Sequence, residues 1–193
     1  DPNLMTMGSG AIRGDGEIVG IAIAVEGWSG YFPIAHEAGG NMDRGLVLDW
    51  FEEVLHTDAT KIFHNAMYDV SWIRALGFYI RGGIIDTMIA ASLVNENRFS
   101  FTLDSISKEY IGMGKNEKTL AEAAKSWGVN PKADMWRLPA PLVGEYAERD
   151  AEVTLKLWQA MKHEITQQDL WDIFNLETRL FPCLVDMKFK GVR

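Results

Sequence analysis

The stretch HNAMYDVSWI, residues 64–73, contains a carboxylate where a helix should be apolar. At the period of an α-helix, Ala66, Val70 and Ile73 form one apolar stripe, and Asp69 falls inside that stripe instead of on the opposite face. An isolated carboxylate in apolar surroundings is costly or becomes protonated, and the stripe contains no lysine or arginine. Asp69 therefore needs another partner, and a metal ion is one that fits.

The stretch YAERDAEVTLKLW, residues 146–158, repeats this pattern. Its apolar stripe is formed by Ala147, Val153, Leu157 and, just beyond the stretch, Met161. Tyr146 and Asp150 lie four residues apart, so both fall on one helix face within the stripe. The sequence thus predicts two helices that each bury a carboxylate.

Composition favours one folded domain of ordinary size. The chain has 193 residues, of which 47% are hydrophobic, enough for a substantial core. The longest apolar runs, such as IVGIAIAV at residues 18–25, are far shorter than the roughly 20 residues of a membrane helix, so no membrane partner is expected. The single Cys183 cannot form an intramolecular disulfide, which is typical of a reducing cytoplasm.

The net charge of −8 at first argues against a nucleic-acid partner. Its distribution changes that interpretation, because residues 1–60 hold ten acidic and two basic side chains, whereas residues 61–193 hold seventeen of each. Six basic residues lie among tryptophans and glycines between residues 108 and 137: Lys108, Lys115, Lys118, Lys125, Lys132 and Arg137. This region could contact a nucleic-acid strand, and an ordinary solvated surface explains the charges equally well.

The order of elements predicts an α/β fold. Residues 17–25 and 30–34 are expected to form an antiparallel hairpin, and residues 43–55 an amphipathic helix with Leu46 among its inward residues. A short strand at 61–63 runs into the helix that contains Asp69, which Gly77 ends. Residues 77–80 are interpreted as a further strand.

Helices dominate the second half of the predicted fold. Asp86 is expected to cap a helix over residues 86–94, and further helices follow near 102–111 and 119–128, the latter with Thr119 and Glu122 at the spacing of a capping box. A long helix then carries Tyr146 and Asp150. Pro182 is expected to kink or break a final helix at residues 171–191.

These motifs together support a family resemblance. In chain order, NAMYD, IIDTMIAASLV, FTLDSISKEYIG and YAERDAEVTLKLW resemble the 3′→5′ exonuclease domain of family A (DNA polymerase I type) DNA polymerases, in the bacteriophage branch. The resemblance covers nearly the whole chain and implies a ribonuclease H-like (DnaQ-like) mixed sheet flanked by helices. It implies an exonuclease domain over residues 1–165 and a helical segment, 166–193, that leads into a polymerase domain of the same parent chain.

The resemblance also implies roles for individual residues. Asp69, Tyr146 and Asp150 match three of the family's catalytic residues, with Asp69 and Asp150 as ligands of two Mg²⁺ or Mn²⁺ ions. Two such ions, about 3.5 to 4 Å apart, activate a water and stabilise charge on the entering and leaving oxygens. Tyr146 would orient the water by hydrogen bonding. His64, Asn65 and Tyr68 would lie near the terminal nucleotide of a single-stranded DNA 3′ end.

One family motif has no clear counterpart. The family's first motif is a D-x-E on its opening strand, and the only D-x-E here, Asp15-Gly16-Glu17, lies among glycines typical of a turn. It is interpreted as loop. The chain is therefore expected to begin in the loop after the motif, with its first strand truncated. A gap or an unpaired edge is then expected beside the first hairpin strand.

The expected function is proofreading in DNA replication, in a bacterial host cytoplasm if a phage encodes the chain. Two alternatives remain open: an exoribonuclease of the ribonuclease D type, and a catalytically silent domain that guides DNA. The individual residues also have structural alternatives. Asp69 and Asp150 could pair with arginines, Tyr146 could belong to the core, and His64 could be a hydrogen-bonded structural residue. Asp86 is interpreted as a cap, outside the site.

Overall fold

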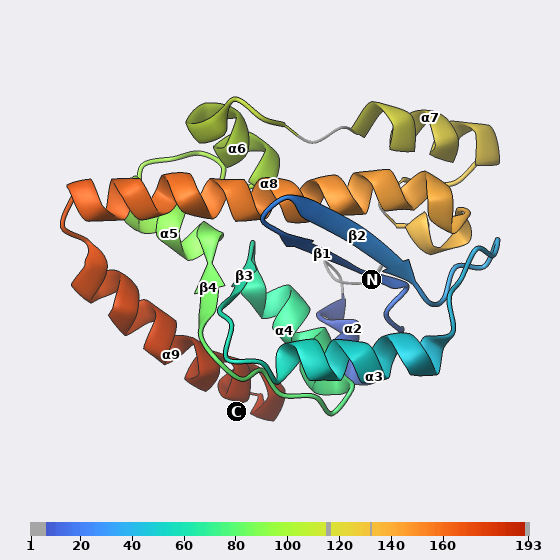
Figure 1. The fold of residues 1–193 in the computed structure, drawn as a ribbon, viewed down its shortest axis with the longest axis horizontal. Helices are drawn as coiled ribbons and strands as arrows, with labels where there is room; N and C mark the ends of the chain where they lie inside the picture. Colours follow the sequence, from blue (N-terminus) through green and yellow to red (C-terminus); the bar gives the residue numbers. More distant parts are fainter. Residues whose placement is uncertain (1–6, 115–116, 132, 192–193) are drawn as a thin grey trace. The chain divides into compact units, whose positions relative to one another are not determined.

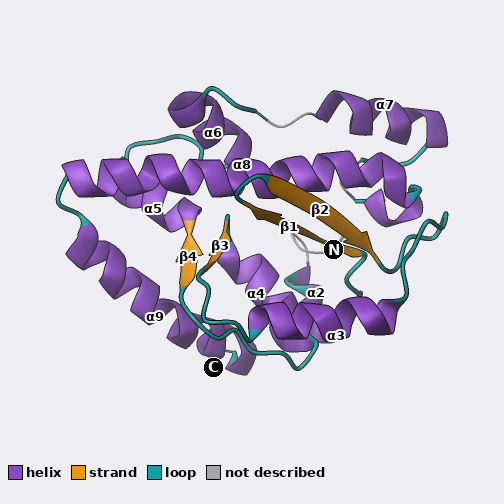
Figure 2. Ribbon diagram, viewed as in Figure 1, coloured by secondary structure: helices purple, strands orange, loops and turns teal. Residues whose placement is uncertain are grey.

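The computed structural model describes residues 7–114, 117–131 and 133–191. The chain divides into two compact units, and each unit is built from two separated segments. The first unit contains Asp1–Val54 and Lys115–Glu152, and the second contains Leu55–Gly114 and Val153–Arg193. Figure 1 follows the chain through its elements, and Figure 2 distinguishes the helices from the strands. The mixture of helices and strands confirms the predicted α/β class.

The first unit is organised around an antiparallel hairpin. Its elements are α2 (Gly10–Arg13), β1 (Gly20–Val25), β2 (Trp28–Pro33), α3 (Arg44–Leu55, whose last residue falls in the second unit), α7 (Glu117–Trp127), the 3₁₀ turn η1 (Met135–Arg137) and the start of α8 (Ala140–Gln167). β1 pairs with β2 so that Gly20 lies opposite Pro33 and Val25 opposite Trp28. The predicted connection, residues 26–29, was too long, because only Glu26 and Gly27 connect the strands and Gly27 supplies a φ of 79°.

Two helix details in this unit correct the sequence prediction. Val47 and Phe51 of α3 are buried, but Leu46, which was expected on the inward side, is 72% exposed, because neighbouring helix positions point about 100° apart. The proposed capping box at Thr119 is wrong, because α7 already begins at Glu117 and Thr119 lies inside the helix. Gly128, with a φ of 65°, follows the end of α7 as predicted.

A buried histidine ties the hairpin to the segment before α8 within the first unit. His36 Nδ1 lies 2.8 Å from the Leu138 carbonyl oxygen, which can only accept, so Nδ1 donates and Nε2 accepts from the Tyr31 hydroxyl at 2.7 Å. Burial lowers the pKa of His36 and raises the pKa of Tyr31 to about 12. Leu138 also belongs to the local core, with Leu120, Ala124 and Val143.

The second unit contains a short parallel ladder and most of the helical core. Its elements are β3 (Lys61–Phe63), α4 (Ala66–Ala75), β4 (Ile84–Asp86), α5 (Thr87–Val94), α6 (Leu103–Ile111), the end of α8 and α9 (Trp171–Lys190). β3 pairs with β4 so that Phe63 lies opposite Asp86. The predicted strand at 77–80 is wrong, because the Phe78 N–H bonds back to the Ile73 carbonyl at the end of α4 and the strand forms later. Gly77, with a φ of 85°, marks that helix end as expected.

Among the described residues, two apolar clusters stabilise the second unit. The larger one joins α5, α6, the end of α8 and α9 through Ala90, Ala91, Leu103, Ile106, Val153, Leu157, Met161, Ile165 and Phe174. The smaller one joins α4 to α9 through Ala66, Val70, Phe181 and Val185. Pro182 does not break α9, because the buried residues on either side hold the helix to the core while the proline removes only one backbone N–H.

Among the described residues, β1–β2 and β3–β4 are each two-stranded, and no ladder joins them. The gap or unpaired edge expected beside the first hairpin strand stays a prediction. No helix in the described ranges is long and apolar enough to cross a membrane. The boundary predicted after residue 165 falls in the last turn of α8 and stays a prediction.

Candidate active site

Asp69 lies in the first turn of α4, directly after β3, and its side chain is partly buried. Desolvation raises its pKa to about 7, the negative charge of Asp86 adds to this rise, and a hydrogen bond from its own backbone amide opposes it. No lysine or arginine forms an ion pair with Asp69 in the described part of the chain, so the arginine-paired alternative does not account for this carboxylate.

Asp86 fixes the position of the helix that contains Asp69. Its buried carboxylate accepts hydrogen bonds from the backbone N–H groups of Asn65 (3.0 Å), Ala66 (2.8 Å) and Met88 (2.9 Å). The bond from Met88 confirms the predicted cap of α5. The other two bonds extend the cap to α4, and the sequence prediction missed this second role. The sequence offered only an aspartate that follows two isoleucines at the start of a predicted helix, which does not reveal a partner 21 positions away.

His64 is hydrogen bonded on both ring nitrogens inside the second unit. Nε2 donates to the Phe101 carbonyl oxygen at 2.9 Å, and Nδ1 lies 2.9 Å from Thr87 Oγ1. These contacts connect the start of α4 to α5 and to the segment before α6. They favour the structural alternative for His64, and its predicted contact with a nucleotide stays a prediction.

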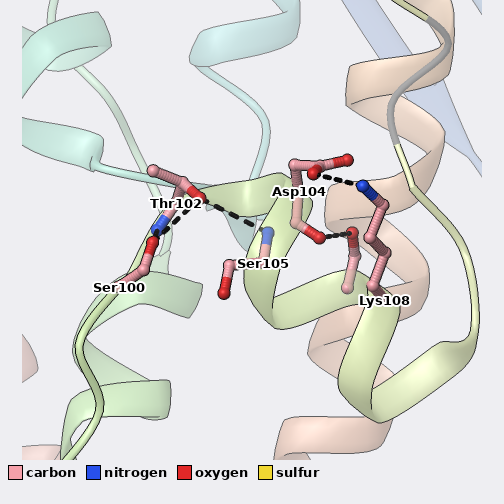
Figure 3. A network of polar contacts seen from close by, with 6 residues as sticks. Ser100, Thr102, Asp104, Ser105 and Lys108 are labelled. Atoms are coloured by element: carbon pink, nitrogen blue, oxygen red, sulfur yellow. Dashed lines mark hydrogen bonds and ion pairs between the residues drawn. The ribbon is translucent and has the colours of Figure 1, made fainter.

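Phe101, whose carbonyl accepts the hydrogen bond from His64, is followed by a polar network at the start of α6 (Figure 3). Thr102 Oγ1 accepts the Ser105 N–H at 3.3 Å, and Ser100 Oγ lies 3.2 Å from Thr102 Oγ1. Lys108 forms an ion pair with Asp104 at 2.6 Å. The network holds the N-terminus of α6 in place. It therefore also fixes the loop that contains Phe101, whose carbonyl oxygen accepts the hydrogen bond from His64.

Asn65 and Tyr68 flank Asp69 in sequence and differ in burial. Asn65 is exposed and has a left-handed backbone with a φ of 63°, and its side chain does not cap α4. Tyr68 is partly buried, packs edge-to-face on Trp72, and has a raised pKa, mainly because of desolvation. An asparagine tolerates this backbone conformation better than most residues, so conformation alone could explain its presence.

Asn65 allows backbone and side-chain roles to be separated. Asn65→Ala is expected to lower the free energy of unfolding by about 1 kcal/mol, whereas Asn65→Gly leaves it unchanged, because glycine adopts a positive φ without strain. If the amide contacts the substrate, both variants lose about tenfold in 3′ end degradation. Urea unfolding and a nuclease assay measure the two effects. Full activity in Asn65→Gly would show that only the backbone conformation matters.

Tyr146 and Asp150 belong to the first unit, on α8. Tyr146 is partly buried against the cluster of Leu120, Ala124, Leu138 and Val143, which agrees with its core alternative and leaves its hydroxyl's role untested. Asp150 is also partly buried, one turn further along the helix. Both residues have further interactions within the fold. The predicted residues are thus divided: His64, Asn65, Tyr68 and Asp69 lie in the second unit, and Tyr146 and Asp150 in the first.

The Asp15-Gly16-Glu17 sequence is loop, as interpreted. Both carboxylates are exposed and engaged in ion pairs, Asp15 with Arg13 at 2.6 Å and Glu17 with Arg44 at 3.3 Å. Within the described ranges, no three His, Cys, Asp or Glu side chains are grouped as a metal site. Asp69 and Asp150 nevertheless provide the hard oxygen donors that Mg²⁺ and Mn²⁺ prefer, so these two residues fit such ions.

The basic region predicted between residues 108 and 137 is only partly described. Lys115 and Lys132 lie outside the described residues, Lys108 is paired with Asp104, and Arg137 is paired with Glu37 at 3.2 Å. These pairs favour an ordinary solvated surface at the two ends of the region. A role in contacting a nucleic-acid strand stays a prediction.

Comparison with known proteins identifies the family. The profile of the 3′–5′ exonuclease of family A DNA polymerases matches residues 6–166. The chain belongs to this exonuclease family. Its sequence is 37% identical to a DNA-directed DNA polymerase of Pseudomonas phage M6, over all of this chain and 30% of the relative. It is 31% identical to the DNA polymerase DpoZ of Salmonella phage PMBT28, over 90% of this chain and 28% of the relative.

Bacterial relatives and solved structures extend this family assignment. The chain is 27% identical to DNA polymerase I of Pseudomonas aeruginosa, over 91% of this chain and 20% of the relative. It therefore spans less than a third of the length of these relatives. A structure described as the apo form of a nuclease superposes with a TM-score of 0.69 at 17% identity, over 94% of this chain and 80% of the other. This likeness supports the ribonuclease H-like exonuclease fold.

The raised pKa of Asp69 predicts a stability cost in this exonuclease domain. Because the folded-state pKa (about 7) exceeds the value of about 3.9 expected in an unfolded chain, the stabilisation by protonated Asp69 is complete below pH 4 and disappears as the pH rises to 7. Asp69→Asn should therefore match the wild type near pH 4 and be more stable by about 1 to 3 kcal/mol at pH 8 without metal.

Urea unfolding in EDTA at pH 4, 6 and 8 measures this difference. Asp49→Asn, at an exposed position on α3, is the matched control for replacing an aspartate with asparagine. A stability difference for Asp69→Asn that is independent of pH would contradict the assigned desolvation.

Proposed function

We propose that residues 1–193 are the exonuclease part of a family A DNA polymerase and hydrolyse the 3′-terminal phosphodiester of single-stranded or frayed DNA. The observation that carries the proposal is Asp69, a desolvated carboxylate without a basic partner among the described residues, inside a chain that matches the exonuclease family. Removing a misincorporated nucleotide in this way would be proofreading. We assign it to the cytoplasm of a bacterial host, in keeping with the phage relatives.

We assign Asp69 and Asp150 as ligands of divalent metal ions, Mg²⁺ or Mn²⁺. Such ions, when bound, lower the pKa of a water and stabilise charge on the phosphodiester oxygens. The two carboxylates would hold the ions in place, and protonated Asp69 must lose its proton to bind, so binding should weaken below pH 7. Tyr146 would donate a hydrogen bond that orients the attacking water, because a neutral phenol is a hydrogen-bond donor and a poor base.

The remaining predicted residues are assigned to the substrate. Asn65 is exposed beside Asp69, and we propose that its amide contacts the terminal nucleotide, with Tyr68 packing nearby. His64 would act through position, because its ring already holds the start of α4 against Thr87 and Phe101. Weak intrinsic affinity for DNA is acceptable in an acidic chain when an attached polymerase domain delivers the 3′ end at high effective concentration.

Matched DNA and RNA oligonucleotides test the proposal. The parent polymerase is incubated with 5′-labelled single strands of identical sequence in Mg²⁺ or Mn²⁺, and products are resolved by length. We expect stepwise shortening from the 3′ end, at least about tenfold faster on DNA, and faster on a mismatched end than on a paired one. Equal or faster degradation of RNA would support the ribonuclease D alternative, and no shortening of either strand would support a silent domain.

A further inference from the structure

Within the first unit, the hairpin and the loop that follows it hold the start of α8 at two levels. At the first level, the His36 imidazole donates to the Leu138 carbonyl oxygen, two residues before α8 begins. At the second level, the carboxylate of Glu148 accepts the backbone N–H of Tyr31 in β2 at 3.1 Å. Tyr31 connects the two levels, because its hydroxyl donates to His36 Nε2 at 2.7 Å. The three residues Tyr31, His36 and Glu148 are here called the α8 clamp.

The ring of Tyr31 also lies directly against α8. A Cβ atom at Gly144 would lie 3.4 Å from Tyr31 Cδ1, which is a van der Waals contact distance, so the ring covers the helix backbone at this glycine. Gly144 lies one turn before Glu148, so both contacts of Tyr31 fall on the same side of the helix. The ring contact and the hydrogen bond together restrict both sliding and rotation of α8 against β2.

The loop that carries His36 is itself fixed by hydrogen bonds. Asn41 Oδ1 accepts the His36 N–H at 2.7 Å, and Asn41 Nδ2 donates to the His36 carbonyl oxygen at 2.8 Å. Further along the loop, the Gly39 carbonyl oxygen accepts the N–H of Ala140 at 3.2 Å, at the first residue of α8. Burial lowers the pKa of His36, so its ring is neutral near pH 7 and offers one donor and one acceptor. The clamp therefore holds α8 from a well-ordered base.

The clamp lies beside the two residues of α8 that are assigned to the reaction. Tyr146 follows Gly144 by two positions, and Asp150 follows Glu148 by two positions. Two positions correspond to about 200° of rotation around a helix, so the clamp contacts α8 without occupying the side of Tyr146 and Asp150. Any change in the height or rotation of α8 at the clamp moves these two side chains as well.

We propose that the α8 clamp consists of positioning residues for the exonuclease reaction, which set the height and rotation of the helix that carries Tyr146 and Asp150. The proposal rests on the proposed function, since it requires the roles assigned to those two residues. A misplacement of about 1 Å at the reacting groups can cost about 10² in rate, so a small movement of α8 is enough. The clamp acts through the helix and not by contact with the DNA.

Two substitutions of Glu148 separate its hydrogen bond from its charge. Glu148→Gln keeps an oxygen that accepts the Tyr31 N–H, whereas Glu148→Ala removes the acceptor. In the parent polymerase, Glu148→Ala is expected to lower the single-turnover rate of 3′ end degradation at saturating DNA by about 10- to 100-fold, and Glu148→Gln should stay within about threefold of the wild type. The DNA concentration that gives half of the maximal rate should change by less than about threefold in both variants. Glu145→Ala, at an exposed position on the same helix, is the control and should change neither quantity.

Tyr31→Phe tests the connection between the two levels of the clamp. It removes the hydroxyl that donates to His36 and keeps both the ring on Gly144 and the backbone N–H. We expect a rate at saturating DNA that is about tenfold lower, again with little change in the half-saturating concentration. Tyr79→Phe, at an exposed tyrosine, is the matched control and should retain the wild-type rate. Tyr31→Phe decides the question alone if Glu148→Ala does not fold.

Three results would overturn the positioning role. Equal rates in Glu148→Ala and Glu148→Gln would show that the bond to Tyr31 makes no difference to the reaction. A change confined to the half-saturating concentration would assign Glu148 to contact with the substrate. Lower stability in urea with wild-type rates at saturating DNA would make the clamp purely structural. In all three cases the wild type still shortens DNA, so the proposed function stands, whereas a wild type that does not shorten DNA would overturn both.

Discussion

Asp69→Ala and Asp150→Ala are each expected to abolish 3′ end degradation in the parent polymerase, while Tyr146→Phe retains a measurable fraction. If the two carboxylates hold the ions as proposed, removing either one disrupts the positions of the ions and the electrostatic stabilisation that depends on them. Loss of the tyrosine hydroxyl removes only the orientation of the water, typically a factor of about 10² to 10⁴ for a group that handles a proton. Single-turnover degradation of a single-stranded DNA measures all three variants.

Two controls accompany this prediction. Asp49→Ala removes an exposed aspartate from α3 and should leave degradation unchanged. Primer extension by the polymerase portion should persist in every variant, which shows that the chain is folded and binds DNA. Equal and small losses in the Asp69, Asp150 and Tyr146 variants would refute the assigned ligands.

Asp86→Ala should cause the largest loss of stability of any substitution considered. Three backbone N–H groups would lose their acceptor, that of Ala66 in a buried setting and those of Asn65 and Met88 in part-buried settings. Each unsatisfied buried donor costs about 1 to 3 kcal/mol, so a total loss of at least about 3 kcal/mol is expected. Urea unfolding of residues 1–193, or of the parent polymerase if the shorter chain is unstable, measures it.

Asp43→Ala is the matched control for Asp86. Asp43 also caps a helix, accepting the Leu46 N–H at 2.9 Å at the start of α3, but it does so at the surface and for one helix only. Its loss should cost about 1 kcal/mol. Similar small losses at both positions would mean that water replaces the missing acceptor at Asp86.

Local patterns made much of this fold predictable. Apolar periodicity identified the helices around Asp69 and Asp150, and glycines marked the ends of α4 and α7. The errors arose where distant contacts decide the outcome. Residues 84–86 form a strand because they pair with residues 61–63, which the composition of residues 77–80 could not reveal. The bonds from Asn65 and Ala66 to Asp86 likewise join segments far apart in the sequence.

The sequence predicted the residue types of the candidate site better than it predicted the surroundings of those residues in the fold. Helical period identified Asp69 and Asp150 as carboxylates in apolar stripes, and their role as metal ligands stays a prediction. The periodicity of a sequence does not show how far a side chain is removed from water or which groups it contacts. It therefore gave no indication that the Asp69 pKa is raised to about 7 or that both ring nitrogens of His64 are hydrogen bonded. Those properties depend on β4, α5 and the segment before α6, which pack around α4 only after folding.

The double cap at Asp86 has a consequence for how related sequences evolve. Asp69 and Asp86 are both acidic and adjacent in space, yet they have opposite effects on stability. Ionised Asp69 lowers the stability of the fold, whereas Asp86 raises it by capping the starts of two helices. A lineage that no longer needed the nuclease reaction would gain stability by replacing Asp69 and would lose the fold by replacing Asp86. A descendant with Asp86 but without Asp69 would then retain the architecture after the chemistry had been lost.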